Sequence, residues 1–234
     1  MQKFIDISKN KNSEKKGIKH LLNKSIVLLI LFLLLILTNI YLLGNQISKQ
    51  EKAAIHLNLA LLHRSNMETE KAIAETEKAI RIYPKYDLAY ASLADIYFQL
   101  GEFEKSLKNY DKALSFKKDP EYYYDKAAVY QGMGMLEEAL NQYKKVIELD
   151  PMASNTLLAI ANTLLDLGRF SESKPYYDKV LELIPNSPNI HNDIGLYYEK
   201  TGDKKRAVEE YQTALQLDPD HALAGQNLER LIGD

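Results

Sequence analysis

The sequence predicts an all-α protein in which one transmembrane helix precedes a solenoid of repeated helix pairs. Three observations predict this fold class. Residues 26–43 are apolar and uncharged, and the chain carries charge of opposite sign on the two sides of this stretch. Downstream, glycine, tyrosine and proline recur at a spacing close to 34 residues. Repeats of this length are typical of helix pairs that bury their apolar faces by stacking on their neighbours.

The net charge of −2 hides two different parts of the chain. Residues 1–25 hold seven lysines against two acidic side chains, a balance of +5, and the rest holds 23 basic and 30 acidic side chains, a balance of −7. The chain has no cysteine, which excludes disulfides, thiol catalysis and thiolate metal sites. The acidic balance of the larger part argues against a nucleic-acid partner.

The apolar stretch has the length of a membrane span. Sixteen of the eighteen residues from 26 to 43 are apolar, and as a helix they would reach about 27 Å across a hydrocarbon core of about 30 Å. No Ala-x-Ala-like cleavage site follows, which favours an uncleaved signal-anchor helix over residues 26–44. Lysines are retained on the cytoplasmic side. We therefore expect a single-pass cell-membrane protein with a basic cytoplasmic leader, 1–25, and the remainder outside the cytoplasm.

A short linker, 45–52, is expected to lead into the repeats. Taking the recurring proline as the thirty-second position of each unit divides the chain into five units, 53–86, 87–119, 120–153, 154–187 and 188–221. Small residues recur where two helices must cross closely, glycine suits the turn between them, and proline ends the second helix. Residues 222–234 are expected to form a C-terminal capping helix and tail.

This pattern resembles the tetratricopeptide repeat (TPR) family over about residues 53–221. It is clearest in YASLADIYFQLGEFEKSLKNYDKAL and IHNDIGLYYEKTGDKKRAVEEYQTALQLDP. The resemblance implies antiparallel helix pairs stacked as a right-handed superhelix, whose concave groove binds peptides or protein segments mainly through the first helices.

Two places depart from the pattern. The first unit has Met67 where the others have glycine and Thr76 where the others have tyrosine. Either a distorted unit or a helix that runs on from the membrane segment would account for this. Lys126 occupies a normally apolar position, and we expect its stem to pack while its amine reaches solvent.

The sequence offers no sign of catalysis. His56, His63 and His191 stand at packing positions of the repeat, and the carboxylates lie beside lysines, as on a solvated helix face. We expect no enzymatic activity, no catalytic residue, no cofactor, no metal and no small-molecule substrate.

The expected binding groove follows from mapping the family's inward positions onto this chain. The resemblance implies that these residues line it: Asp95, Phe98, Gln99, Tyr124, Gln131, Asn155, Leu158, Asn162, Asn189 and Asn192. The four asparagines suggest an amide-lined stretch for a peptide backbone, although ordinary surface asparagines would look the same. The family's basic clamp for a terminal carboxylate is missing, because its positions hold Leu57, Leu61, Ser92, Glu121 and Asp125. A neutral or basic segment is therefore a better partner than an acidic one.

The sequence thus favours a membrane-anchored scaffold or adaptor that binds a protein segment, with residues 26–43 in the lipid bilayer. Envelope assembly, secretion and membrane-protein quality control are the roles that anchored members of the family suggest. Two alternatives remain open, a self-assembling structural scaffold and a non-catalytic accessory subunit of a membrane enzyme complex.

Overall fold

The computed structural model describes residues 29–39 and 47–233. Every regular element in these two ranges is a helix, and neither range contains a strand. The all-α prediction is therefore confirmed for the described residues. The chain divides into two compact units, Met1–Ala54 and Ile55–Asp234.

In the first unit, residues 29–39 form a helix whose side chains are exposed. The predicted span is longer than this helix, and its ends, 26–28 and 40–44, lie outside the described residues, as does the leader 1–25. Among the helices of the described ranges, none has both the length and the apolar character that a membrane crossing requires. The span over residues 26–44 stays a prediction.

Helix α2 (Lys49–Ser65) begins earlier than the predicted first repeat, so part of the expected linker 45–52 is helical. A capping box explains the start. The backbone N–H of Glu51 donates to the Ser48 hydroxyl (3.1 Å), and the N–H of Ser48 donates to the Glu51 carboxylate (2.7 Å).

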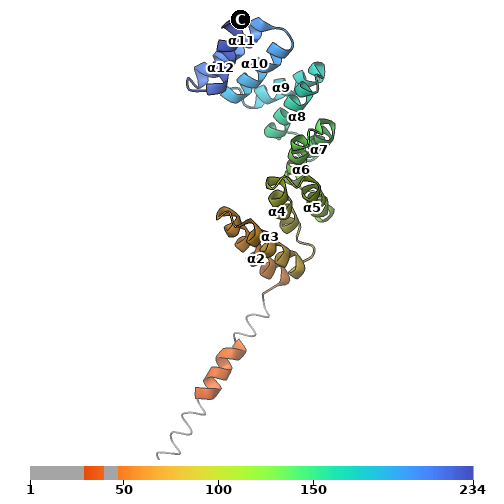
Figure 1. The fold of residues 1–234 in the computed structure, drawn as a ribbon, viewed down its shortest axis with the longest axis vertical. Coiled ribbons are helices and arrows are strands. Elements are labelled where there is room, and N and C mark those ends of the chain that lie inside the picture. Colours follow the sequence, from red (N-terminus) through yellow and green to blue (C-terminus); the bar gives the residue numbers. More distant parts are fainter. Residues whose placement is uncertain (1–28, 40–46, 234) are drawn as a thin grey trace, which may run out of the picture. The chain divides into compact units, whose positions relative to one another are not determined.

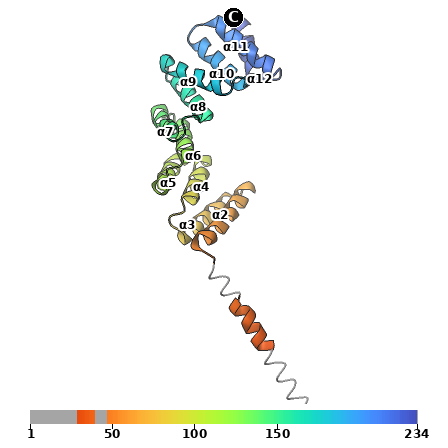
Figure 2. The same cartoon turned by 180° about the vertical axis from the view of Figure 1, so that it is seen from behind.

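The remaining helices alternate along the second unit in antiparallel pairs (Figures 1 and 2). Their bounds are α3 (Thr69–Ile82), α4 (Asp87–Gln99), α5 (Phe103–Phe116), α6 (Pro120–Gly132), α7 (Leu136–Leu149), α8 (Ser154–Asp166), α9 (Phe170–Leu183), α10 (Pro188–Lys200), α11 (Lys204–Leu217) and α12 (Ala222–Gly233). Each helix from α3 to α11 packs against the next one in the chain. This arrangement is a solenoid of helix pairs, as predicted.

The turn inside each pair has the same backbone conformation. Gly101, Gly134, Gly168 and Gly202 have φ between 71° and 87°, the left-handed region that favours glycine. Met67 takes this place in the first pair with φ 60°, and the following N–H of Glu68 bonds the His63 carbonyl (2.9 Å). The first repeat, 53–86, is therefore not distorted at its turn, although a residue with a Cβ occupies the left-handed position.

The core alternates small and large side chains. Alanines such as Ala94, Ala127 and Ala161 are fully buried at the helix crossings. Beside them lie four fully buried tyrosines, Tyr110, Tyr143, Tyr177 and Tyr211. The fold thus places one large phenol in each of the last four pairs, where it must find a hydrogen-bond partner.

The Lys126 stem packs as expected, but its amine is held by a neighbouring carboxylate, which the sequence did not predict. Lys126 is 9% exposed, and its Nζ donates to Asp111 of the preceding helix at 2.5 Å and lies 5.7 Å from the centre of the Tyr130 ring. An ammonium group at a buried position needs such a partner, and Asp111 supplies it.

Candidate functional site

The first helix of each pair is joined to the first helix of the next pair by side-chain contacts. The contacts from α2 to α12 are Arg64 with Asp95 (3.5 Å), Tyr122 with Asp87 (3.0 Å), Gln131 with Thr163 (3.1 Å), Asn162 with Asp193 (3.1 Å) and Asn227 with Asn192 (3.0 Å). We call the surface that these polar side chains line the first-helix face. Four of the ten residues that the sequence assigned to the groove take part in these contacts: Asp95, Gln131, Asn162 and Asn192.

The buried tyrosines donate hydrogen bonds from the core to polar side chains of the first helices. The Tyr143 hydroxyl donates to Gln131 at 2.7 Å and the Tyr211 hydroxyl donates to Glu199 at 2.9 Å. In the same way Tyr110 donates to Asp95 and Tyr177 donates to Asn162. Burial raises the pKa of all four phenols, so each remains a proton donor. The acceptors on the face are therefore fixed in place before any ligand arrives.

Three of the four asparagines of the expected amide-lined stretch already have hydrogen-bond partners within the molecule. Asn162 accepts from Tyr177 and donates to Asp193, and Asn192, which is 6% exposed, accepts from Asn227. Asn189 pairs with His221 at 2.8 Å. Asn155 is the one of the four whose side chain has no hydrogen-bond partner among the described residues, and it is exposed.

The remaining predicted residues have more varied surroundings. The Phe98 ring lies 6.0 Å from Phe103, and the Tyr124 ring lies 5.3 Å from Tyr143. Gln99 is exposed, whereas Leu158 is half-buried against the core beneath α8 and α10. Tyr124, Phe98 and Gln99 each line a pocket, and the pocket of Phe98 and Gln99 also includes Asp95.

Pockets open along the first-helix face. One of about 530 Å³ lies between α6 and α8, and Glu121, Tyr124, Asp125 and Asn155 are among its lining residues. A second, of about 200 Å³, lies among α2, α4 and α6, and a smaller one of about 140 Å³ adjoins it. Asp125 lines all three. The structure therefore brings Tyr124 and Asn155 together and adds Asp125, which was not among the predicted groove residues.

Asp125 is electrostatically unusual. Burial, together with the nearby carboxylates of Asp95, Glu121 and Asp119, raises the pKa of its side chain to about 7. A partial signal for this residue was present in the sequence, because Glu121 and Asp125 stand where the family's basic clamp would be. It did not show that these two carboxylates would share pockets with Asp95 and Arg64.

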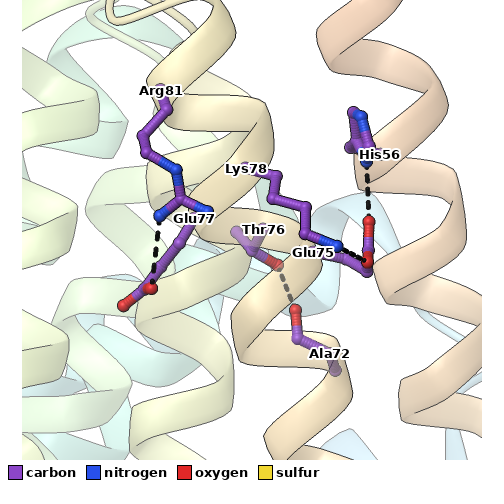
Figure 3. Close-up of polar contacts among 7 residues, drawn as sticks. All are labelled: His56, Ala72, Glu75, Thr76, Glu77, Lys78 and Arg81. Atoms are coloured by element: carbon purple, nitrogen blue, oxygen red, sulfur yellow. Dashed lines mark hydrogen bonds and ion pairs between the residues drawn. The ribbon is translucent and has the colours of Figure 1, made fainter.

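Three histidines, His56, His63 and His191, are held by glutamate carboxylates. Figure 3 shows His56 of α2 pointing toward Glu75 of α3, with an Nδ1–Oε2 distance of 2.7 Å and with Lys78 on the other oxygen. His191 and Glu210 repeat this pair at 2.7 Å, and His63 pairs with Glu68 at 2.5 Å. In the described part of the chain, no group of three or more side chains is arranged to hold a metal ion.

Family models match most of the repeat region. Models described as tetratricopeptide repeat match residues 53–86, 120–152 and 158–222, and a model described as TPR repeat matches residues 94–134.

Curated relatives share this region of the chain. A TPR repeat-containing protein of Methanocaldococcus jannaschii is 28% identical over 162 residues, which is 65% of this chain and 28% of that protein. The mitochondrial import receptor subunit TOM70 of Saccharomyces cerevisiae is 32% identical over 89 residues, 38% of this chain and 14% of TOM70. The human protein O-mannosyl-transferase TMTC1 is 25% identical over 183 residues, 61% of this chain and 20% of TMTC1. The chain thus spans between 14% and 28% of the length of these three relatives.

Solved structures share the fold. YrrB, described as a TPR protein with an unusual peptide-binding site, superimposes with a TM-score of 0.62 at 22% identity, over 73% of this chain and 89% of YrrB. A tetratricopeptide repeat protein from Parabacteroides merdae reaches a TM-score of 0.70 at 19% identity, over 78% of this chain and 74% of that protein. At such identities the likeness establishes the fold alone.

Proposed function

The chain belongs to the tetratricopeptide repeat family, whose repeats indicate a protein–protein interaction scaffold, and we propose that it binds an extended protein segment along its first-helix face. The observation that carries this proposal is the pocket of about 530 Å³ between α6 and α8. There Tyr124 offers an aromatic surface and Asn155 an amide that can both donate to and accept from a peptide backbone.

Fixed polar groups farther along the same two helices, α6 and α8, support the same function. Gln131 and Asn162 are held by buried tyrosines and by the next first helix, so binding would cost little side-chain ordering. A segment lying across several first helices would therefore meet a preorganised surface.

The pairing of the described histidines and carboxylates agrees with a binding role without catalysis. The histidines of the helix pairs are paired with glutamates, and the carboxylates of Asp95 and Glu199 accept tyrosine hydroxyls. TMTC1 is named a transferase, but this chain spans only a fifth of it. The proposed scaffold needs no cofactor and no small-molecule substrate.

We further propose that residues 26–44 anchor the protein in the cell membrane with residues 1–25 in the cytoplasm. The apolar run and the lysine excess before it support this topology. The interaction domain would then act close to a membrane, in envelope assembly, secretion or membrane-protein quality control, roles that rest on analogy with anchored family members. A reporter that is active only outside the cytoplasm, fused after Asp234, should be active; an inactive fusion in a stably produced protein would invert the topology.

Site-specific crosslinking tests the binding face. Photoreactive residues at positions 124 and 155 of the full chain, in native membranes, should capture the same protein. The control position is 108, where Lys108 is exposed on the second helix α5. Equal capture at all three positions, or none at 124 and 155, would contradict binding at the α6–α8 pocket.

A further inference from the structure

The pocket of about 200 Å³ among α2, α4 and α6 combines an acidic lining with apolar walls. Its lining includes Leu57, Leu61, Ser92, Asp95, Glu121 and Asp125. We call it the acidic pocket. It lies at the positions where a carboxylate-binding relative would place basic residues, so its charge is opposite to that of such a clamp.

The negative charge of the acidic pocket is only partly balanced within the molecule. Asp95 has two partners, the Tyr110 hydroxyl and the Arg64 guanidinium at 3.5 Å. The carboxylates of Glu121 and Asp125 have neither a hydrogen-bond nor an ion-pair partner among the described residues. Arg64 is thus the one cationic side chain in a lining that holds three carboxyl groups. Burial, with the nearby carboxylates adding to it, raises the pKa of Asp125.

A buried hydroxyl in the same lining also lacks a partner. Ser92 is 7% exposed, and its Oγ makes no hydrogen bond within the described part of the chain. Buried hydroxyls are nearly always bonded, and a serine oxygen accepts readily from a cationic N–H. This unused acceptor belongs to the lining of the same pocket as the two unmatched carboxylates.

The apolar part of the lining suits the stem of a long basic side chain. Leu57 and Leu61 come from α2, and Leu88 and Ala91 come from α4. Lysine and arginine pack their methylene groups on such walls while their charged ends meet carboxylates. A metal ion would not use the walls, and the described residues contain no group of three or more side chains poised as metal ligands.

We propose that the acidic pocket binds a basic side chain, an arginine or a lysine, that projects from the protein segment lying on the first-helix face. The guanidinium of arginine is the better match, because its planar fork of donors can reach more than one carboxylate and the Ser92 hydroxyl together. This inference rests on the proposed function and specifies the chemistry of the partner.

Two matched peptides test the inference on the full chain in detergent micelles. Both have capped ends and about nine residues of alanine, glycine and serine; one has a central arginine and the other its neutral isostere, citrulline. Backbone amide resonances of α2, α4 and α6 report binding by NMR titration. We expect the arginine peptide to bind at least about fivefold more tightly than the citrulline peptide, because its contact with the carboxylates is charge-assisted. Equal affinities would overturn the proposal.

Isosteric variants locate the effect. Glu121→Gln together with Asp125→Asn should bring the arginine peptide down to the affinity of the citrulline peptide, and the single variant Asp125→Asn should give an intermediate loss. Glu104→Gln, at an exposed carboxylate of α5, is the control and should change nothing. A preference for arginine that survives the double variant would also overturn the proposal. Crosslinks at positions 124 and 155 test the proposed function separately, because neither position requires a charged ligand.

Discussion

At the scale of single residues, Met67 carries the clearest local strain. It is the one non-glycine residue with positive φ among the described residues, and its side chain is 91% exposed. A side chain in the left-handed region costs about 1 kcal/mol or somewhat more, and an exposed one gains no packing in return.

Met67→Gly should therefore stabilise the protein by about 1 kcal/mol, because glycine adopts this conformation without a Cβ penalty. Urea unfolding followed by circular dichroism measures the change. The reverse substitution at an equivalent turn, Gly168→Met, is the matched control and should destabilise by a similar amount, since φ is 72° there and its surroundings are open. A neutral or destabilising Met67→Gly would show that the turn is not strained.

Asp125 gives the stability a specific pH dependence. Its folded-state pKa of about 7 lies above the value of about 3.9 for an unfolded aspartate. The native state therefore keeps the proton between about pH 4 and pH 7, and the free energy of unfolding falls as the pH rises through that window. Burial is the largest cause of the raised pKa of Asp125, and the carboxylates of Asp95, Glu121 and Asp119 add to it. Arg64 and the Tyr110 phenol line a pocket together with Asp125.

Asp125→Asn should abolish this fall. At pH 8 the variant should be more stable than the wild type by about 1–2 kcal/mol, because the carboxylate is half-buried and solvent screens its neighbours. Near pH 4, where both the native and the unfolded wild type still hold the proton, the two should be alike. Urea unfolding at both pH values measures the difference, with Glu104→Gln as the exposed control. The same difference at both pH values would rule out titration of Asp125 as its cause.

At the scale of helices, α10 and α11 cross closely at a glycine. Of the described glycines, Gly195 leaves the least room for an added Cβ. A Cβ added to Gly195 would lie 2.5 Å from the Tyr211 ring. That ring is fully buried, and its hydroxyl is bonded to Glu199. Tyr211 therefore has little freedom to move away, and this pair uses glycine where the other pairs use alanine.

Gly195→Ala should destabilise the protein by about 1–3 kcal/mol, even though alanine is the better helix former, because the added methyl overpacks the crossing. Thermal unfolding measures the loss. Gly225→Ala in α12 is the control, since its Cβ would meet only Leu215 at 4.0 Å, and it should be neutral or stabilising by up to about 1 kcal/mol. Equal effects at the two glycines would argue against a clash with Tyr211.

The helix pattern was readable from the sequence, whereas the partners of individual side chains were not. Recurring glycine, tyrosine and proline predict the pairs, and the Ser48–Glu51 capping box could have shown that α2 begins before the first repeat. The pairing of Lys126 with Asp111, and of Asn162 with Tyr177 and Asp193, depends on how neighbouring helices align. A periodic pattern indicates which positions face inward, but it does not determine which side chains form hydrogen bonds or ion pairs with one another. For that reason the sequence did not show that three of the four asparagines have partners within the molecule, nor that the acidic pocket exists.

At the scale of the whole molecule, α12 completes the solenoid of Ile55–Asp234 because it and the residue before it form hydrogen bonds and an ion pair with α10. Asn227 donates to Asn192, Arg230 contacts Glu199 through both oxygens at 2.6 and 3.0 Å, and His221 pairs with Asn189. Terminal elements of this kind cover surface that another repeat would otherwise bury.

Deleting residues 222–234 should lower the midpoint of thermal unfolding by about 5 °C or more and promote self-association, because the surfaces of α10 and α11 lose their cover. Calorimetry and sedimentation measure the two effects. Arg230→Ala is the milder control, which removes an exposed ion pair and should shift the midpoint by no more than about 2 °C. A truncated chain as stable and as monomeric as the full chain would mean that α12 is dispensable.

The tyrosines behind the first-helix face have an evolutionary consequence. Each tyrosine donates a hydrogen bond from the hydrophobic core to a polar residue of the first helices, as Tyr143 does to Gln131 and Tyr211 does to Glu199. Changing such a residue to suit a new partner would leave a buried hydroxyl without an acceptor, so specificity there would drift slowly. Asn155 and Gln99 have no such tether in the described part of the chain. Divergence in binding preference should therefore begin at these two positions, while the tethered ones change only together with their tyrosines.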